Sequence, residues 1–180
     1  VSGFQAGERI ETKMIQEIIE WMLIRCNQMN ISVSHLVIHR DGKAINSEIE
    51  DFKQYLDEEG ISFDYVAVKK NHNRRMIIED HQRYVARDGL LYLRKNEAYL
   101  CSTNPSAKMG MARPIKVEKA YGSTPMKKIV QDIYCLTYMN THALNRFRHP
   151  ATIFGADGIS KFKNRGWLPS LKNDARLLHV

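Results

Sequence analysis

The sequence predicts an α/β domain, and three observations support this fold class. Helical periodicity alternates with short apolar runs between residues 12 and 68. The first apolar run ends in an acid and a glycine, Asp41-Gly42, and the second ends in a basic segment, residues 69–75. Open α/β sheets carry their chemistry at the C-terminal ends of strands, so we expect Asp41 to stand at a functional edge.

The first two predicted elements are a helix and a strand. Residues 12–29 place apolar side chains three and four positions apart, which is typical of an amphipathic helix. The triplet Leu36-Val37-Ile38 predicts a buried strand, and Gly42 lets the chain turn directly after Asp41.

The next helix and strand complete a parallel crossover. Ser47 is expected to cap a helix that ends at Gly60. Residues 63–68 are almost continuously apolar, as in a strand covered on both faces. The order helix, strand, helix, strand implies a right-handed parallel connection.

The second half of the chain is predicted to contain shorter elements. Strand-like pieces occupy residues 90–93 and 98–101, and helical spacing returns over residues 125–145. Pro150 ends that helix, and a final helix is expected to start near Gly155. A chain of 180 residues that is 43% apolar normally forms one domain.

Composition narrows the class of partner. The net charge of +7 favours a polyanion, although a merely basic surface is the simpler alternative. The three cysteines form no C-x-x-C pair and have apolar neighbours, which indicates reduced core residues of a cytoplasmic protein. No apolar run reaches membrane-spanning length, so no membrane partner is expected.

A protein kinase is one alternative reading of the first strand. His39, Arg40, Asp41 and Asn46 fit the kinase pattern H-R-D-x-x-x-x-N, and residues 66–69 resemble the strand with the ATP-binding lysine. In kinases, however, the lysine strand comes before the catalytic loop, whereas here it follows. The order of the motifs therefore argues against a kinase.

Five ordered segments resemble the Piwi domain of Argonaute proteins and together span almost the whole chain. They are Arg40-Asp41-Gly42 with the basic loop from Val68 to Arg75, then Tyr99-Leu100-Cys101-Ser102, Gly110-Met111-Ala112-Arg113-Pro114, Tyr134-Cys135-Leu136-Thr137-Tyr138, and the stretch from Pro150 to Asp157. The resemblance implies an RNase H-like α/β fold, a mixed sheet flanked by helices. It further implies a prokaryotic Argonaute, because the last catalytic position carries an aspartate.

The resemblance also implies a catalytic tetrad of acids. Asp41 takes the third position and Asp157 the fourth, while Glu8 fits the glutamate of the tetrad best and Glu11 fits it less well. The first aspartate belongs to the opening strand of the fold and is expected upstream of Val1. Residues 1–180 are then the C-terminal part of a Piwi domain that works with the MID, PAZ and N-terminal regions, and this part is expected to be inactive by itself.

Acids at these positions suit phosphodiester hydrolysis. In-line attack of water uses two divalent ions about 3.5–4 Å apart, and Mg²⁺ or Mn²⁺ prefers oxygen ligands. Asp41 and Asp157 are the expected metal ligands. Taken singly, each acid has a simpler explanation: Asp41 as a turn residue, Asp157 as a helix cap and Glu8 as a surface acid. The ordered set of motifs favours catalysis.

Basic residues are expected to hold the nucleic-acid backbone, since phosphate contacts give affinity without reading sequence. The candidates are Lys70, His72, Arg75, Arg113 and Arg146. A solvated charge run is the alternative for each of them. The C-terminal carboxylate of Val180 is expected near the guide 5′-phosphate, where the resemblance implies that it helps to hold a metal ion.

The function implied by the resemblance is guided cleavage of nucleic acid. A short guide, with DNA favoured, pairs with a complementary single-stranded target, which the nuclease cuts in defence against invading DNA. The rival hypothesis is a module of the same family that binds guide and target without cutting. Because inactive members usually lose tetrad acids, the presence of Asp41 and Asp157 favours cleavage.

Overall fold

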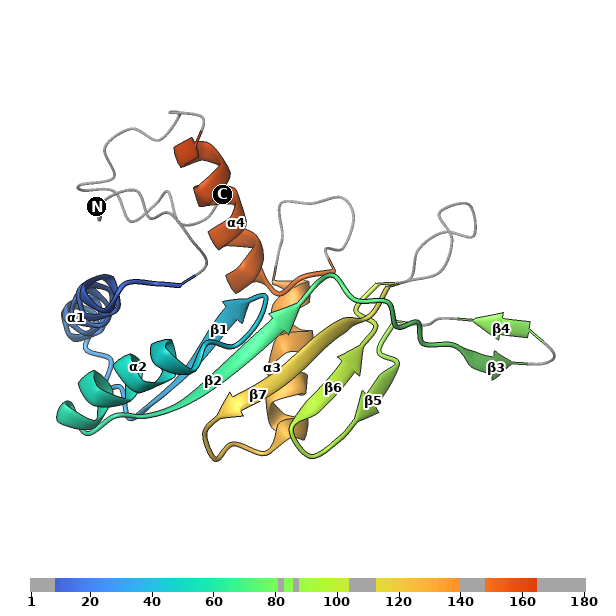
Figure 1. Ribbon diagram of the computed structural model, residues 1–180, viewed down its shortest axis with the longest axis horizontal. Helices are drawn as coiled ribbons and strands as arrows, with labels where there is room; N and C mark the ends of the chain where they lie inside the picture. Colours follow the sequence, from blue (N-terminus) through green and yellow to red (C-terminus); the bar gives the residue numbers. More distant parts are fainter. Residues whose placement is uncertain (1–8, 81–82, 86–87, 104–112, 140–147, 165–180) are drawn as a thin grey trace.

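The computed structural model describes residues 9–80, 83–85, 88–103, 113–139 and 148–164, and its architecture is a mixed β-sheet with helices on both faces (Figure 1). The four helices in this part of the chain are α1 (Thr12–Gln28), α2 (Asn46–Glu58), α3 (Met126–Tyr138) and α4 (Ala151–Asn164). The strands are β1 (His35–Asp41), β2 (Ser62–Lys69), β3 (Ile78–Asp80), β4 (Arg83–Val85), β5 (Leu91–Leu93), β6 (Glu97–Leu100) and β7 (Ile115–Tyr121).

Five strands form the main sheet in the order β1-β2-β7-β6-β5. β1 and β2 are parallel, with Asp41 opposite Val68, and the remaining neighbours are antiparallel. The predicted parallel crossover is thereby confirmed. β3 and β4 form a separate hairpin, which lies beyond β5 at the right of Figure 1.

β2 is buried on both faces, which explains its continuous apolar sequence. Phe63 and Tyr65 pack with α1 and α2, whereas Val66 and Val68 pack with α3 across the sheet. Successive side chains of a strand point to opposite faces, so one strand serves two hydrophobic cores.

β1 is less buried than predicted. Val37 is 42% exposed, and Leu36 and Ile38 are only half-buried. The reason is that β1 lies at an edge of the described sheet, so its apolar triplet is covered from one side only.

Several predicted boundaries are wrong. Ser47 lies inside α2, where Ile45 is the N-cap and makes no side-chain cap bond. α4 starts at Ala151, not near Gly155, because the Pro150 carbonyl already accepts the N–H groups of Ile153 and Phe154. The predicted helix over residues 125–145 ends at Tyr138, and its last residues lie outside the described part of the chain.

One predicted core residue is exposed. Cys135 points to solvent from α3, whereas Cys101 is buried and Cys26 is half-buried. The apolar neighbours of Cys135 in sequence lie on a different face of the helix, with Ile133 buried. No helix among the described residues has the length and apolarity needed to cross a membrane.

Candidate active site

Asp41 is the last residue of β1, and the turn after it depends on glycine. Gly42 has φ +94°, a conformation that L side chains rarely adopt. Its N–H donates to the Val68 carbonyl at 3.0 Å, which continues the β1–β2 pairing beyond the strand. The Asp41 side chain is 38% exposed, so the carboxylate stands at the sheet edge and remains accessible.

Lys70 joins Asp41 to Asp157. The Lys70 Nζ lies 2.7 Å from Asp41 Oδ2 and also contacts Asp157 Oδ2 in a very short ion pair. Asp41 ends β1, Lys70 directly follows β2 and Asp157 lies in the second turn of α4. Three elements that are distant in sequence therefore meet at one ammonium group.

Charge and burial act in opposite directions on Lys70. Burial lowers the pKa of Lys70. The hydrogen bonds to Asp157 and Asp41, together with the negative charges of these two acids, raise the pKa by more than burial lowers it. The pKa of Lys70 therefore lies above its ordinary value. The Lys70 side chain is 18% exposed and the Asp157 side chain is 34% exposed. One lysine between two carboxylates leaves an acidic site that is open to solvent.

A histidine fixes the helix that carries Asp157. The Nδ1 atom of His39 lies 2.9 Å from Oγ1 of Thr152, in the first turn of α4. Burial lowers the pKa of His39, which favours the neutral ring, although Asp132 opposes this shift. Because His39 lies two residues before Asp41 on the same face of β1, this contact sets the position of α4 relative to Asp41. Figure 1 shows α4 rising beyond the end of β1.

A buried ion pair fixes the backbone of Asp41 from the opposite face. The Arg40 guanidinium donates to Glu48 Oε2 on α2 at 3.1 Å and to the Asp41 carbonyl at 2.5 Å. Glu48 is fully buried and also accepts the Tyr65 hydroxyl and the Ile10 N–H. The carboxylate oxygens of Glu48 thus hold β1, β2, α2 and the segment just before α1 together.

The donor chemistry of the acid pair suits Mg²⁺ or Mn²⁺. Carboxylate oxygens are hard ligands, and the ammonium of Lys70 marks a point where both carboxylates reach one cation. Within the described residues no group of three or more His, Cys, Asp or Glu side chains gathers around one point. The pair therefore fits as part of a ligand set that other oxygens complete.

Not every predicted site residue is described. Glu8, Arg146 and Val180 lie outside the described residues. Glu11, the weaker candidate for the glutamate position, is the exposed residue before α1.

Among the described residues, several of the predicted basic residues lie near Arg148. Burial lowers the pKa of Arg148, and the charges of the exposed Arg113 and of Arg75 lower it further. The Arg148 guanidinium donates to the Lys70 carbonyl at 3.0 Å. The sequence prediction named Arg146 and not Arg148, because both arginines flank Phe147 and no local spacing distinguishes them.

His72 is half-buried, and both of its ring nitrogens have partners within the protein. Its Nε2 lies 2.8 Å from the Pro114 carbonyl, and its Nδ1 accepts the Arg74 N–H at 3.1 Å. Burial lowers the pKa of His72, and the nearby charges of Arg148, Arg75 and Lys116 lower it further, although the bond to Pro114 opposes this. His72 therefore joins the loop after β2 to the start of β7.

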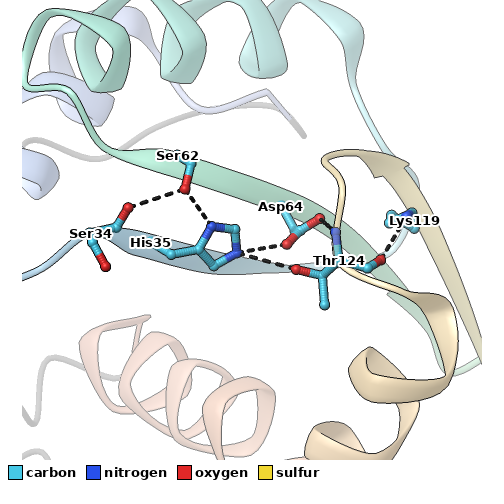
Figure 2. A network of polar contacts seen from close by, with 6 residues as sticks. All are labelled: Ser34, His35, Ser62, Asp64, Lys119 and Thr124. Carbon is cyan, nitrogen blue, oxygen red and sulfur yellow. Dashed lines mark hydrogen bonds and ion pairs between the residues drawn. The ribbon is translucent and has the colours of Figure 1, made fainter.

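A second polar cluster lies at the opposite ends of the same two strands (Figure 2). His35 Nε2 is 2.7 Å from Asp64 Oδ2, and His35 Nδ1 is 2.7 Å from the Ser62 hydroxyl. In a hydrolytic Ser-His-Asp triad the serine donates to the imidazole. Here Ser62 donates to the Ser34 carbonyl, and the fully buried Asp64 also accepts the Thr124 N–H. The cluster is a closed structural network.

A hollow of about 700 Å³ also lies away from the acid pair, beside the start of β2 and the end of β7. Its lining includes Lys95, Lys119 and Tyr121. We place the candidate active site at the acid pair, because two predicted catalytic acids from distant parts of the sequence meet there, whereas the hollow contains none of the predicted site residues.

The sequence of this chain is similar to those of known proteins. The chain matches the Piwi domain over residues 1–167. It is 30% identical over 139 residues to the Argonaute of Aquifex aeolicus, covering 77% of this chain and 19% of that protein. It is 29% identical over 172 residues to the Argonaute of Thermus thermophilus, covering 93% of this chain and 24% of that protein.

The fold agrees with a solved Argonaute structure. Clostridium butyricum Argonaute bound to a guide DNA and a 19-mer target DNA superposes with a TM-score of 0.86 and 29% identity, covering 98% of this chain and 24% of that one. The mixed sheet with its flanking helices is thus the RNase H-like fold. The chain belongs to the Piwi domain family and is similar to the Piwi domains of prokaryotic Argonautes. It spans about a quarter of the length of these relatives or less.

Proposed function

We propose that this chain is the nuclease part of a guide-directed Argonaute that cuts a single-stranded target paired to a short guide. The single observation that carries the proposal is the meeting of Asp41 and Asp157 at one cation position. Both carboxylates are partly exposed at the C-terminal edge of the sheet, where a phosphodiester can approach them.

Asp41 and Asp157 are the proposed metal ligands, with Glu8 as a third acid. When bound, Mg²⁺ or Mn²⁺ supplies activation of the attacking water and stabilisation of the leaving oxygen. Asp41 would bind from the rigid end of β1, which Arg40 fixes from behind, and Asp157 from α4, which His39 holds in place. The C-terminal carboxylate of Val180 is a further proposed ligand, near the guide 5′ end.

The basic residues around the acid pair are the proposed contacts to the guide and target backbones. They are Lys70, Arg75, Arg113 and Arg146, to which we add Arg148 because it contacts the Lys70 backbone. His72, whose two ring nitrogens already bond within the protein, would order the loop that carries them rather than supply a charge. The related Clostridium butyricum structure holds a guide DNA and a target DNA, which supports a nucleic-acid duplex as the partner. We propose a DNA guide, a DNA target and a role in host defence in the cytoplasm.

The edge position of β1 supports the expected arrangement of the complete domain. β1 pairs with β2 on one side, and its other side is an edge of the described sheet. We propose that a strand bearing the first tetrad acid pairs with this edge and brings that acid beside Asp41. The same pairing would satisfy the backbone N–H and C=O groups on the outer edge of β1.

Substitution of the acid pair in the complete protein tests the proposal. Asp41→Ala and Asp157→Ala should each reduce Mg²⁺- or Mn²⁺-dependent cleavage by ~10³-fold or more, because metal stabilisation of the transition state is worth several kcal/mol. Guide–target affinity should stay within a few fold, since these acids serve the metal. Gel assays of cleavage and filter binding measure the two quantities separately.

Asp57→Ala is the matched control, because Asp57 is an exposed aspartate at the C-terminal end of α2. It should cut like the unchanged protein. Survival of cleavage in either acid variant would reject the tetrad assignment. Binding of guide and target without cleavage by the unchanged protein would support the rival hypothesis of an inert binding module.

A further inference from the structure

Lys70 occupies the position between the two acids that a metal ion would need. Its Nζ contacts Oδ2 of both Asp41 and Asp157, so these two oxygens lie no farther apart than two hydrogen-bond lengths. Two carboxylates at such a separation repel each other unless a cation lies between them. In this structure the lysine supplies that cation.

The direction of the Lys70 side chain follows from strand geometry. Lys69 and Lys70 are adjacent, so their side chains leave opposite faces of the sheet. Lys69 Nζ pairs with Glu118 Oε2 on β7 at 2.6 Å, whereas Lys70 turns to the face that carries Asp41. The two neighbouring lysines therefore have separate acid partners.

The backbone around Lys70 is tied down, which limits where its ammonium can go. Arg148 donates to the Lys70 carbonyl, and the Gly42 N–H donates to the carbonyl of Val68, two residues before Lys70. The Lys70 side chain is only 18% exposed. Release of the ammonium from the acids would therefore require rotation of the Lys70 side chain rather than movement of the strand ends.

We propose that Lys70 is an internal counterion that holds Asp41 and Asp157 together in the metal-free state and is displaced when a divalent ion binds. This inference rests on the proposed function, in which the two aspartates are metal ligands. Lys70 is a positioning residue under this proposal. An ammonium and a divalent ion cannot share the space between the same oxygens, so each must exclude the other.

Displacement would leave Lys70 available for a phosphate group. The charges of Arg75 and Arg113 already act on Arg148, which contacts the backbone of Lys70, so a released ammonium enters a cationic surface. Metal binding and binding of the nucleic-acid backbone would then be coupled through the Lys70 side chain.

Mn²⁺ binding to the complete protein without nucleic acid tests the inference. Free Mn²⁺ would be followed by electron paramagnetic resonance, and the double variant Asp41→Asn/Asp157→Asn would identify binding at this site. Lys70→Met removes the charge while keeping a long apolar chain, so the Kd for Mn²⁺ should fall about 10-fold. Lys70→Arg keeps a cation and should restore a Kd close to that of the unchanged protein.

Lys69→Met is the matched control and should leave the Kd unchanged, because Lys69 pairs with Glu118 on the other face. A second readout is the melting temperature. In EDTA, Lys70→Met should melt at a lower temperature than the unchanged protein. Saturating Mn²⁺ should then raise the melting temperature of Lys70→Met by more than it raises that of the unchanged protein. If Lys70→Met does not fold, Lys70→Gln replaces it in both measurements.

The outcomes separate the inference from the proposed function. Equal or weaker Mn²⁺ binding in Lys70→Met and Lys70→Gln would overturn the counterion role while leaving the metal site intact. Unchanged Mn²⁺ binding in the double aspartate variant would overturn the proposed function, and the inference with it.

Discussion

The two ends of the β1–β2 pair carry polar clusters of similar composition but opposite character. At the N-terminal ends, Asp64 is fully buried, and its two oxygens accept from Thr124 and contact His35 (Figure 2). At the C-terminal ends, Asp41 and Asp157 are more than one-third exposed and share one lysine. We call the first cluster closed, because its acid is buried and both carboxylate oxygens have partners, and the second open, because its acids remain accessible to solvent.

The difference teaches that polar residues in a group do not by themselves mark a functional site. Asp64 has no capacity left for a ligand, because both of its oxygens are used and the Gly122 backbone packs against it. The acid pair instead keeps an accessible surface and an excess of negative charge over its single lysine. Remaining binding capacity distinguishes the site from the structural network.

Removing the buried acid should have the largest effect on stability. Asp64→Ala leaves the Thr124 N–H and His35 without their partner, so we expect a loss of about 3–5 kcal/mol. Asp41→Ala should cost less than about 1 kcal/mol, because its carboxylate is exposed and Asp157 still pairs with Lys70. Thermal unfolding followed by circular dichroism compares the two. Similar losses in both variants would break the contrast between a closed and an open cluster.

Two glycines sharpen the same comparison. A Cβ on Gly122 would lie 1.9 Å from Asp64 Oδ1 and 2.7 Å from its Cα, at φ +107°. Gly42 has φ +94° but nothing within 4 Å of its added Cβ. Gly122→Ala should therefore cost about 3 kcal/mol or more, and Gly42→Ala about 1–2 kcal/mol from backbone strain alone. Melting temperatures measure the ranking, and an equal cost would mean that the steric contact at Gly122 relaxes freely.

The open end should also respond to acid. Burial lowers the pKa of His149 to about 4, with the charges of Arg148 and Lys70 adding to the shift while Asp157 and Asp41 oppose it. The unfolded chain then binds more protons than the folded one between about pH 6.5 and pH 4, so stability falls as the pH drops through this window. The slope is at most about 1.4 kcal/mol per pH unit, and less because His149 is only half-buried.

His149→Gln should flatten this part of the pH profile, since glutamine does not titrate. The measurement is the melting temperature of both proteins at half-unit steps from pH 7.5 to pH 4.5. Parallel profiles for the two proteins would assign the acid sensitivity to other groups.

The smallest expected effect is on the salt dependence of binding. Arg75→Ala should reduce the slope of log affinity against log salt by about 1 and weaken binding equally for all guide sequences. His72→Gln should leave the slope unchanged at pH 7.5, because the ring is neutral and both of its nitrogens bond within the protein. Lys128→Ala serves as the control, since Lys128 is exposed on α3 and pairs with Asp132.

Binding of the complete protein to guide and target would be measured across a salt series. An unchanged slope for Arg75→Ala would mean that the basic loop is an ordinary solvated surface and not a phosphate contact. A sequence-selective loss would mean that this loop reads bases.

Much of the fold could be predicted from local patterns. The continuous apolar run of β2 indicated burial on both faces, and the structure confirms two cores on either side of that strand. β7 was not predicted, although Ile115 and Val117 alternate with Lys116 and Glu118. Its charged residues pair with neighbouring strands, so its outward face is charged and the apolar run is interrupted.

The sequence by itself determined the family, the strand that ends in Asp41 and the turn at Gly42, because these depend on residue types at fixed local spacing. Only the tertiary structure decided that Lys70 lies between Asp41 and Asp157 and that Arg148 holds the Lys70 backbone. Those contacts join β1, the end of β2 and α4, and their formation depends on strand order and helix placement. Local spacing cannot encode a meeting of side chains that the packing of distant elements brings about.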